Sequence, residues 1–305
     1  MRVMSIHDNL VLQTLEPVTH DLGGFKVHRT LPHRERTMVG PFIFFDQMGP
    51  AHLPPGGGID VRPHPHIGLS TVTYLFDGAF QHRDSLGTDA RITPGAVNLM
   101  TAGTGIVHSE RSPADVRPGG PALSGIQTWL ALPDGREDIA PAFEHVEADA
   151  LPLVEAGGAR ARVIMGDLWG VGAPTTTHAT TIYADILLNA GAAVPIDDAA
   201  EERAIYLAQG DATLDGLTLA PQRLYVLRPG VRATLSSARG GRAMLAGGSA
   251  FATRRHVWWN FVHSSREAIN EAKRAWKAGR FAAVPGESEA IPLPEFTPPK
   301  TVSYP

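Results

Sequence analysis

Residues 58–78 read GIDVRPHPHIGLSTVTYLFDG. In this stretch the alternating run TVTYLF follows two histidines and ends at Asp-Gly, a pair that favours a turn. Similar short runs, each bounded by Gly, Pro or Asp, continue from Val11 to about Pro133, among them FKVHRTL, PFIFFDQM, VNLMTAG and GIQTWLALP. This pattern predicts a barrel or sandwich of antiparallel strands.

The second half of the chain repeats this rhythm, with the runs ARVIMGD, TTIYADILLN, RAIYLAQGDATLDG, QRLYVLRPG, RATLSSA and AMLAGG. Residues 206–216, YLAQGDATLDG, parallel residues 74–84, YLFDGAFQHRD, weakly in letters but regularly in order. Residues 134–158 between the two sets are richer in Ala, Glu, Asp and Pro and show little alternation, which is typical of a connector. The sequence therefore predicts two copies of one β-fold.

A length of 305 residues is more than one ordinary core needs and is comfortable for two domains. We expect an N-terminal barrel over residues 1–135, a connector over 136–157, a C-terminal barrel over 158–252, and a helix with an extended tail over 253–305. The fold class expected from this arrangement is all-β.

The one convincing helical pattern is HSSREAINEAKRAWKAGR, residues 263–280. Ser264 and Glu267 have the spacing of a capping box at its start, and Gly279 supplies a stop. An apolar stripe suited to docking on a core is formed by Ile269, Ala272 and Trp276. The proline-rich tail after the helix is expected to be extended.

The bulk composition excludes several partners. The net charge is -4, with basic and acidic residues mixed along the chain, so the sequence carries no basic footprint for direct nucleic-acid binding. No apolar run approaches the ~20 residues of a membrane span, and the start lacks the apolar core of a signal peptide, so we expect a cytoplasmic protein without a membrane partner. Because there is no cysteine, any bound metal must be held by His, Asp or Glu.

The two histidines of the quoted stretch, His64 and His66, are candidate metal ligands. Residues i and i+2 of a strand point to the same side, and Pro63 and Pro65 restrict the backbone around them. Such a pair by itself is weak evidence, since many such pairs bind nothing.

A second pair of the same form lies in GTGIVHSE, residues 103–110. His108 and Glu110 are also two apart and follow a glycine-rich turn. If the two strands are neighbours with inward-facing pairs, three imidazoles and one carboxylate converge, a donor set suited to a divalent first-row metal. Zinc fits these donors as well as iron does, so spacing alone leaves the metal open.

The spacing Gly58, His64, His66 resembles the first motif of the cupins, and the segment 95–108 is similar to the second. Cupins usually carry a glutamate ligand three or four residues beyond the second histidine. Here Ser70 and Thr71 occupy those places, so the expected carboxylate ligand is Glu110.

Within the cupins the chain resembles the pirin family from about residue 20 to residue 292. The resemblance rests on PHPHIGLSTVTYLFDG, HRDSLG, PGAVNLMTAGTGIVHSE, GIQTWLALP and WNFVHSSREAINEAKRAWKAGRF. It implies two tandem jelly-roll cupin barrels with a short C-terminal α-helix. It also implies an iron site in the N-terminal barrel, whose ligands fall on His64, His66, His108 and Glu110.

Two departures from the family pattern affect the chemistry. Many pirins carry Glu where this chain has Ser70, which implies different hydrogen bonding or charge around the metal. In the second half the place of the histidine pair holds AAVPIDDAAEER, residues 192–203, and His178 stands isolated, so we expect a C-terminal barrel without metal. For His82 and Asp84 the sequence leaves two interpretations open, namely orientation of a metal ligand and a place on a surface hairpin.

The resemblance implies an activity like that of quercetin 2,3-dioxygenase. The metal, Fe(2+) with Zn, Mn, Ni, Cu and Co as the open alternatives, would bind a flavonol hydroxyl, and Glu110 would take its proton before dioxygen attacks the ring. The alternative implied by other pirins is an iron-dependent, redox-sensitive regulatory protein that binds a transcription regulator or a metabolic enzyme. A cupin isomerase or storage protein with another small ligand is a third hypothesis.

Overall fold

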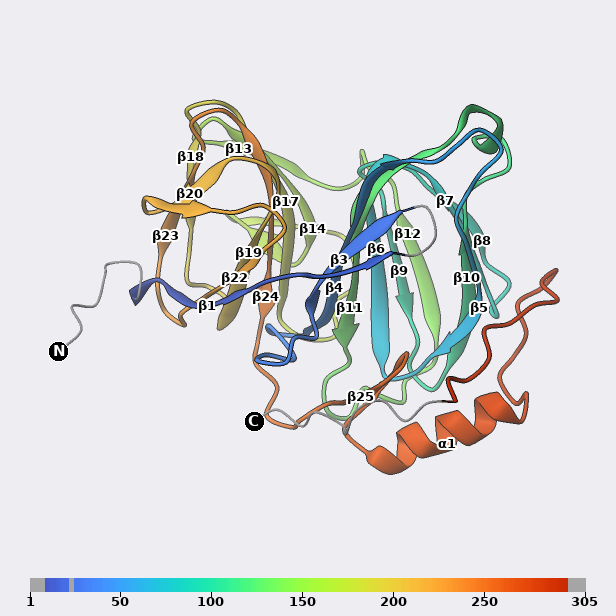
Figure 1. The fold of residues 1–305 in the computed structure, drawn as a ribbon. Helices are drawn as coiled ribbons and strands as arrows, with labels where there is room; N and C mark the ends of the chain where they lie inside the picture. The colour runs from blue at the N-terminus through green and yellow to red at the C-terminus, as the bar shows by residue number, and fades with distance from the viewer. Residues whose placement is uncertain (1–8, 22–24, 296–305) are drawn as a thin grey trace. The chain divides into compact units, whose positions relative to one another are not determined.

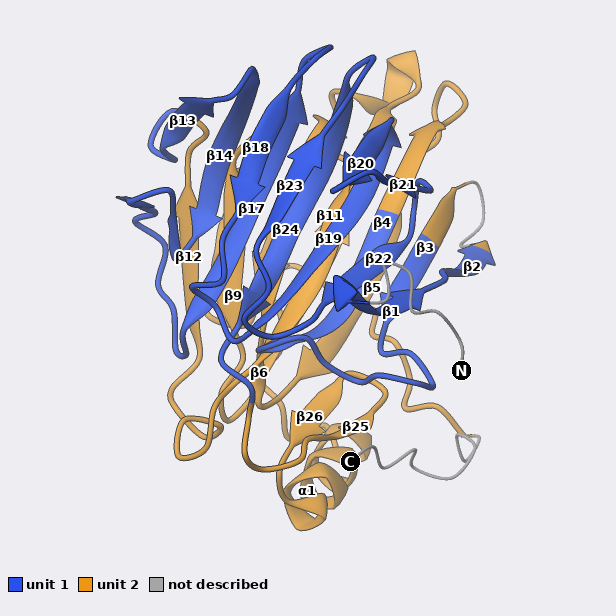
Figure 2. Ribbon diagram, turned by 90° about the vertical axis from the view of Figure 1, so that its left-hand side faces the viewer, with its two compact units in different colours: residues 1–20, 28–47, 149–250 blue, residues 21–27, 48–148, 251–305 orange. Residues whose placement is uncertain are grey.

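The computed structural model describes residues 9–21 and 25–295, and the part of the expected extended tail beyond residue 295 lies outside the described residues. The predicted class is confirmed, because the described elements are almost all β-strands with one α-helix (Figure 1). The chain forms two compact units (Figure 2). Unit 1 contains residues 1–20, 28–47 and 149–250, and unit 2 contains residues 21–27, 48–148 and 251–305.

Unit 2 is built on a four-stranded sheet of order β5-β10-β7-β8 and on strands of a seven-stranded sheet of order β12-β9-β6-β11-β4-β3-β2. A 3-10 helix, Arg117–Gly119, precedes β11. The strands are β2 (Val18–Asp21), β3 (Lys26–Leu31), β4 (Phe42–His52), β5 (Asp60–His66), β6 (Leu69–Gly78), β7 (Phe80–Asp84), β8 (Asp89–Ile92), β9 (Val97–Thr101), β10 (Ile106–Arg111), β11 (Ala122–Ala131) and β12 (Ala142–Val146). Along the chain β2, β3 and β4 each pass from one unit into the other.

Unit 1 repeats these sheets with a seven-stranded order β1-β22-β19-β24-β17-β14-β13 and a four-stranded order β18-β23-β20-β21. The strands β15 and β16 form a separate two-stranded sheet. The strands are β1 (Val11–Leu15), β13 (Leu153–Ala156), β14 (Ala159–Met165), β15 (Asp167–Leu168), β16 (Val171–Gly172), β17 (Thr181–Leu188), β18 (Ala193–Ile196), β19 (Glu202–Gly210), β20 (Ala212–Leu214), β21 (Leu217–Leu219), β22 (Leu224–Leu227), β23 (Ala233–Ser236) and β24 (Gly241–Gly248).

The two strand orders correspond position by position, which confirms the predicted duplication. β18, β23, β20 and β21 occupy in unit 1 the places of β5, β10, β7 and β8 in unit 2. The repeat has one exception in chain order. In unit 2 the edge strand β12 pairs with β9, whereas in unit 1 the equivalent edge strand is β1, from the start of the chain, which pairs with β22. The compact units are therefore interleaved along the chain, whereas the expected domain limits at 135, 157 and 252 are linear and stay a prediction. The expected connector contributes β12 and β13 to the two units.

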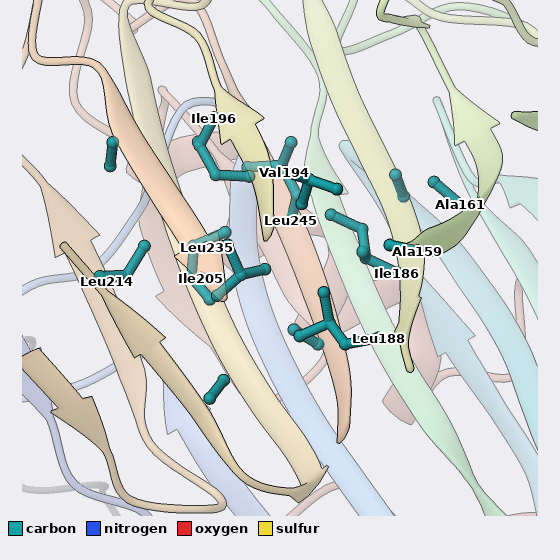
Figure 3. Packing of buried hydrophobic residues seen from close by; sticks show 14 of the residues in the cluster. Ala159, Ala161, Ile186, Leu188, Val194, Ile196, Ile205, Leu214, Leu235 and Leu245 are labelled. Carbon is teal, nitrogen blue, oxygen red and sulfur yellow. The ribbon is translucent and has the colours of Figure 1, made fainter. Parts of the chain in front are cut away.

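The core cluster of unit 1 is aliphatic apart from Tyr225, and Figure 3 shows part of it. Alternation on β18 and β23 turns every second side chain inward, where it packs against residues of β14, β17, β19 and β24. The labelled members of this core are Ala159, Ala161, Ile186, Leu188, Val194, Ile196, Ile205, Leu214, Leu235 and Leu245.

Unit 2 has an apolar cluster of its own that involves β6, β7 and β8. Its buried members are Phe25, Val27, Met48, Leu53, Ile59, Leu75, Phe80, Ile92, Ala96 and Leu123. The histidines of β5 and β10 are buried outside this cluster. The inner surface of unit 2 therefore has an apolar part and a polar part.

The C-terminal segment of unit 2 contains β25 (His256–Trp258), β26 (Phe261–His263) and α1 (Arg266–Lys277). The predicted capping box is wrong by one residue, because the Ser265 hydroxyl accepts the amide of Ala268, while Ser264 hydrogen-bonds Glu137. Gly279, with φ of 65°, lies just after the helix as predicted. No helix in the described part of the chain is long and apolar enough to cross a membrane.

The tail after α1 is attached to the strands that carry the candidate ligands. The Ile291 amide donates to the Pro63 carbonyl at 2.8 Å. The Glu287 carboxylate, largely buried, accepts hydrogen bonds from the Ser109 hydroxyl at 2.9 Å and from the Arg111 guanidinium at 2.6 and 3.0 Å. Ser109 and Arg111 alternate with His108 and Glu110 on β10, so the tail lies on the outer side of this strand.

Candidate metal centre

The three candidate histidines converge inside unit 2. β5 and β10 are antiparallel neighbours, and their register places His108 directly opposite His64. The Nε2 atoms of His66 and His108 lie 3.1 Å apart, and the ring centroids of His64 and His108 lie 4.4 Å apart. One ligand atom from each of the three rings lies within 4.8 Å of the others.

The surroundings keep these imidazoles neutral, which is the form that binds a metal. Burial lowers the pKa of His64 to about 4. Burial, with neighbouring histidines as the next cause, also lowers the pKa values of His66 and His108 well below their ordinary value. The Nδ1 of His64 lies 2.8 Å from the Arg62 carbonyl, to which it can only donate, so Nε2 keeps its lone pair.

This donor set fits a divalent metal ion. Two nitrogens that each lie ~2.1 Å from one metal, at a right angle, are about 3.0 Å apart, close to the separation seen between His66 and His108. Within the described ranges 9–21 and 25–295, these histidines are the one group of three His, Cys, Asp or Glu with this proximity. Imidazole nitrogen binds zinc, iron, nickel, copper and cobalt, so the donors establish a metal site without choosing its ion.

Glu110 lies on the inner face of β10 with His108, and directly opposite His82 on β7. Burial raises the pKa of its carboxyl group, against the opposing effects of His82 and of a hydrogen bond from Thr73. The Thr73 hydroxyl lies 3.2 Å from Glu110 Oε1 and 2.8 Å from Gln127 Oε1. Glu110 is outside the close group of three histidines, so its place as a fourth ligand remains a prediction.

Ser70 does not share the inner face of β6 with Thr73. The two residues are three apart in a strand whose pairing with β9 is regular between them, so their side chains point to opposite faces. The Ser70 hydroxyl is 2.9 Å from that of Thr101 on β9. The residue that shares the Thr73 face is Thr71. The expected influence of Ser70 on the metal must therefore be indirect.

His82 and Asp84 are buried on the inner side of β7, so the surface-hairpin interpretation of these two residues is wrong. The Nδ1 of His82 lies 3.4 Å from the Nδ1 of His108, and its Nε2 lies 3.0 Å from Asp84 Oδ2. The His82 ring is stacked on Phe143 of β12, with centroids 4.5 Å apart. The sequence signal for this inward placement was that His82 and Asp84 are two residues apart in a strand. The same spacing selected His64 and His66.

Sequence reasoning missed other residues around the histidines. Thr73 and Gln127 hold the Glu110 side of the site, Trp129 of β11 meets His66 edge to face at 5.1 Å, and Phe143 covers His82. These side chains come from β6, β11 and β12, which belong to the facing sheet. Only the packing of two sheets brings them to β5 and β10.

Unit 1 has apolar residues at the equivalent positions. In unit 2, His108 lies opposite both His64 and Asp84. In unit 1, Leu235 lies opposite both Val194 and Leu214. Val194, Ile196 and Leu235 therefore stand where unit 2 has His64, His66 and His108. Figure 3 shows these three apolar side chains.

Two acidic residues of unit 1, Asp198 after β18 and Glu202 at the start of β19, have protein partners. Asp198 forms an ion pair with Arg232 at 2.9 Å. Glu202 accepts hydrogen bonds from the guanidinium of Arg36 at 3.1 Å and from the amide of Gly40 at 2.6 Å. The four acidic residues of this stretch resemble a hard-cation site in sequence, but an acidic loop is usually just solvated, and the contacts of Asp198 and Glu202 favour the second interpretation.

Two jelly-roll units of one topology, with a histidine cluster between strands of one unit, define a bicupin. Comparison with known protein families identifies the bicupin family to which the chain belongs. Residues 24–130 match the Pirin family, and residues 183–282 match the Pirin C-terminal cupin domain. The chain belongs to the pirin family.

Relatives cover nearly the whole chain. A pirin-like protein of Caulobacter vibrioides is 44% identical over 279 residues, which are 90% of this chain and 96% of that one. The crystal structure of quercetin 2,3-dioxygenase from Acinetobacter baumannii matches with a TM-score of 0.85 and 34% identity, over 94% of this chain and 97% of that one. The bacterial pirin YhhW of Escherichia coli, solved in complex with nickel(II), shares the fold with a TM-score of 0.62 and 18% identity, over 77% of this chain and 98% of that one.

Proposed function

We propose that this chain is an Fe(2+)-dependent dioxygenase of the quercetin 2,3-dioxygenase type, which opens the ring of a flavonol with O2. The observation that carries the proposal is the group of three buried, neutral imidazoles with a partly buried carboxyl group, Glu110, on the same inner surface. The likeness to the quercetin 2,3-dioxygenase of Acinetobacter baumannii supports the substrate class.

His64, His66 and His108 would hold the metal, with Glu110 as the fourth protein ligand. A bound ferrous ion supplies Lewis acidity toward a phenolic hydroxyl and one-electron chemistry toward dioxygen. Other divalent ions fit the same donors, and the nickel(II) held by the pirin YhhW is an example from the family. We place Fe(2+) first because the resemblance to the iron-binding pirins implies it, whereas the donors alone fit several divalent ions.

Glu110 is the residue that we assign as the base. Burial raises the pKa of its carboxyl group in the metal-free chain. Beside a bound metal, proton loss from the substrate hydroxyl and metal binding of its oxygen strengthen each other, so a nearby carboxylate can serve as the base. The Thr73 hydroxyl lies 3.2 Å from one of the Glu110 oxygens, Oε1. In this assignment Glu110 takes the proton of the flavonol hydroxyl, and Thr73 fixes the carboxylate in place.

Two aromatic side chains beside the histidines support a flat, aromatic substrate. Trp129 lies beside His66, and Phe143 lies beside His82, so two ring systems border the polar cluster. Aromatic rings bury large apolar areas and offer faces and edges to another ring. A flavonol would place its rings against these side chains and its hydroxyl group toward the histidines.

Oxygen uptake tests the proposal. The metal-free protein is loaded anaerobically with one equivalent of Fe(2+), mixed with a flavonol and then exposed to O2. We expect oxygen consumption and ring cleavage, and a loss of about 100-fold or more in rate for Glu110→Gln. The matched control is Glu155→Gln, an exposed glutamate of unit 1 that should keep the wild-type rate.

The proposal fails if the iron-loaded protein consumes no oxygen with any flavonol and Glu110→Gln behaves like the wild type. If, in addition, one partner protein is retained only by the Fe(III)-loaded chain, the regulatory alternative replaces the enzyme. If oxygen is consumed with another loaded ion and not with iron, the metal assignment is wrong while the reaction class stands.

A further inference from the structure

A buried chain of three side chains leads away from the histidine cluster. His108 on β10 contacts His82 on β7, Nδ1 to Nδ1, at 3.4 Å, and His82 contacts Asp84 through Nε2 and Oδ2 at 3.0 Å. The exposed fractions of His108, His82 and Asp84 are 1%, 3% and 0%. The order of these contacts runs from the candidate metal position to a carboxylate that water does not reach.

Asp84 is fixed by the turn that follows β7. Its Oδ1 accepts the backbone amides of Leu86 at 2.9 Å and Thr88 at 3.1 Å. Of these three partners, only His82 contacts Oδ2. Since an ionised carboxylate can only accept hydrogen bonds, the proton that His82 shares with Asp84 belongs to Nε2 of the imidazole.

This arrangement determines the role of each nitrogen. A neutral His82 with its proton on Nε2 has a lone pair on Nδ1, and this lone pair faces Nδ1 of His108. His108 must then donate from Nδ1, which leaves the lone pair of its Nε2 directed toward the Nε2 of His66.

We infer that Asp84 and His82 form a positioning pair that holds His108 in the tautomer and orientation required of a metal ligand. His64 meets the same requirement with a main-chain acceptor, the Arg62 carbonyl. His108 instead relies on side chains, and a carboxylate behind its partner imidazole strengthens its donation to the metal. The inference rests on the metal-binding part of the proposed function and is independent of the oxygen chemistry.

Packing of His82 on Phe143 has to be separated from hydrogen bonding to His108. His82→Leu keeps an apolar side chain against Phe143 and removes the acceptor. His82→Gln keeps an acceptor oxygen. Asp84→Asn keeps the size of the side chain but can donate to His82, which reverses the proton positions along the chain. The control is Asp89→Asn at the outer end of the same hairpin, where Asp89 pairs with Arg83.

Affinity for Co(2+), measured by competition with a chromogenic chelator, is the first measurement. We expect His82→Leu and Asp84→Asn each to weaken Co(2+) binding by about 10- to 100-fold. His82→Gln should recover part of that loss, and Asp89→Asn should match the wild type. If His82→Leu does not fold, as judged by circular dichroism, the Co(2+) affinities of Asp84→Asn and His82→Gln are compared with that of the wild type instead.

The second measurement is proton NMR of the Co(2+)-loaded protein in H2O and D2O. The paramagnetic ion shifts the exchangeable Nδ1 protons of its ligands, and the His64 proton, bonded to Arg62, serves as the internal reference. In His82→Leu the His108 proton should exchange rapidly while the His64 proton persists. A general loosening of the fold would affect both protons.

The outcomes are distinguishable. Wild-type affinity in His82→Leu and Asp84→Asn, with both shifted protons retained, overturns the inference and leaves the proposed function intact. Failure of the wild type itself to bind Co(2+) overturns both. Loss of oxygen uptake in a wild-type protein that binds its metal overturns the proposed function alone.

Discussion

Units 1 and 2 have corresponding strand orders, yet the core of unit 1 is almost entirely aliphatic and the interior of unit 2 contains a cluster of imidazoles with carboxyl groups beside it. Val194, Ile196 and Leu235 occupy the inward positions that His64, His66 and His108 occupy in unit 2. The jelly roll therefore fixes where inward side chains meet, and the residue types at a few positions decide whether chemistry occurs there.

The largest expected effect is loss of the bound metal, the property that distinguishes unit 2 from unit 1. His108→Ala removes one of the three ligands, so the protein should fall from one bound equivalent of divalent metal to none after dialysis at micromolar free metal. The measurement is metal content by mass spectrometry. As a control, His178→Ala in unit 1 should keep one equivalent. Retention of the metal by His108→Ala would mean that the cluster is not the site.

The next effect is on stability in the aliphatic unit. Leu214→Ala truncates a fully buried side chain in the core of unit 1, and we expect a loss of about 2–5 kcal/mol in the free energy of unfolding. Chemical denaturation measures it. Metal content should stay at one equivalent, because Leu214 belongs to the other unit. Loss of metal in this variant would show that the two interiors are coupled.

In the metal-free protein, the buried histidines of unit 2 should make the free energy of unfolding depend on pH. Burial lowers the pKa of folded His64 to about 4, so an unfolded chain takes up this proton first as the pH falls below ~6.5. The associated stability is present above pH ~6.5 and is lost as the pH approaches 4, by about 3 kcal/mol for this group. The shifts of His66 and His108 act in the same direction.

The check is the free energy of unfolding at pH 7 and pH 5, compared between the wild type and His64→Gln, both without metal. The variant should lose less stability between the two pH values. Equal pH dependence in the two proteins would contradict the assignment of a buried, neutral His64.

The smallest effect concerns the acidic stretch of unit 1. Asp198 pairs with Arg232 on the surface, and exposed ion pairs of this kind contribute little. Asp198→Asn should therefore leave both the melting temperature and the metal content unchanged. A fall in metal content would reveal a second cation site in unit 1 and remove the distinction between the units.

The sequence was sufficient to predict the duplication, the strand-rich class and the convergence of three histidines. These predictions depend on local rules, since alternation fixes which side chains share a face and spacing by two repeats the pattern on β5 and β10. Residues 64, 66 and 108 could be selected in this way without knowledge of the facing sheet.

Non-local contacts explain what could not be predicted. Both Ser264 and Ser265 can cap a helix, and the hydrogen bonds of Ser264 to Glu137 leave the role to Ser265. The inward face of β7 was compatible with two roles for His82 until the neighbour of that strand was known. Pairing of β1 with β22 joins segments about two hundred residues apart, which no local pattern encodes.

That last pairing also affects how safely the protein can be shortened. β1 is the edge strand of its sheet, and its hydrogen bonds cover the backbone of β22. A chain that lacks residues 1–20 would keep every candidate metal ligand. It would, however, expose a row of unpaired amides and carbonyls on β22. Such edges recruit strands from other molecules, so the shortened protein would be prone to self-association and aggregation while its metal chemistry stayed intact.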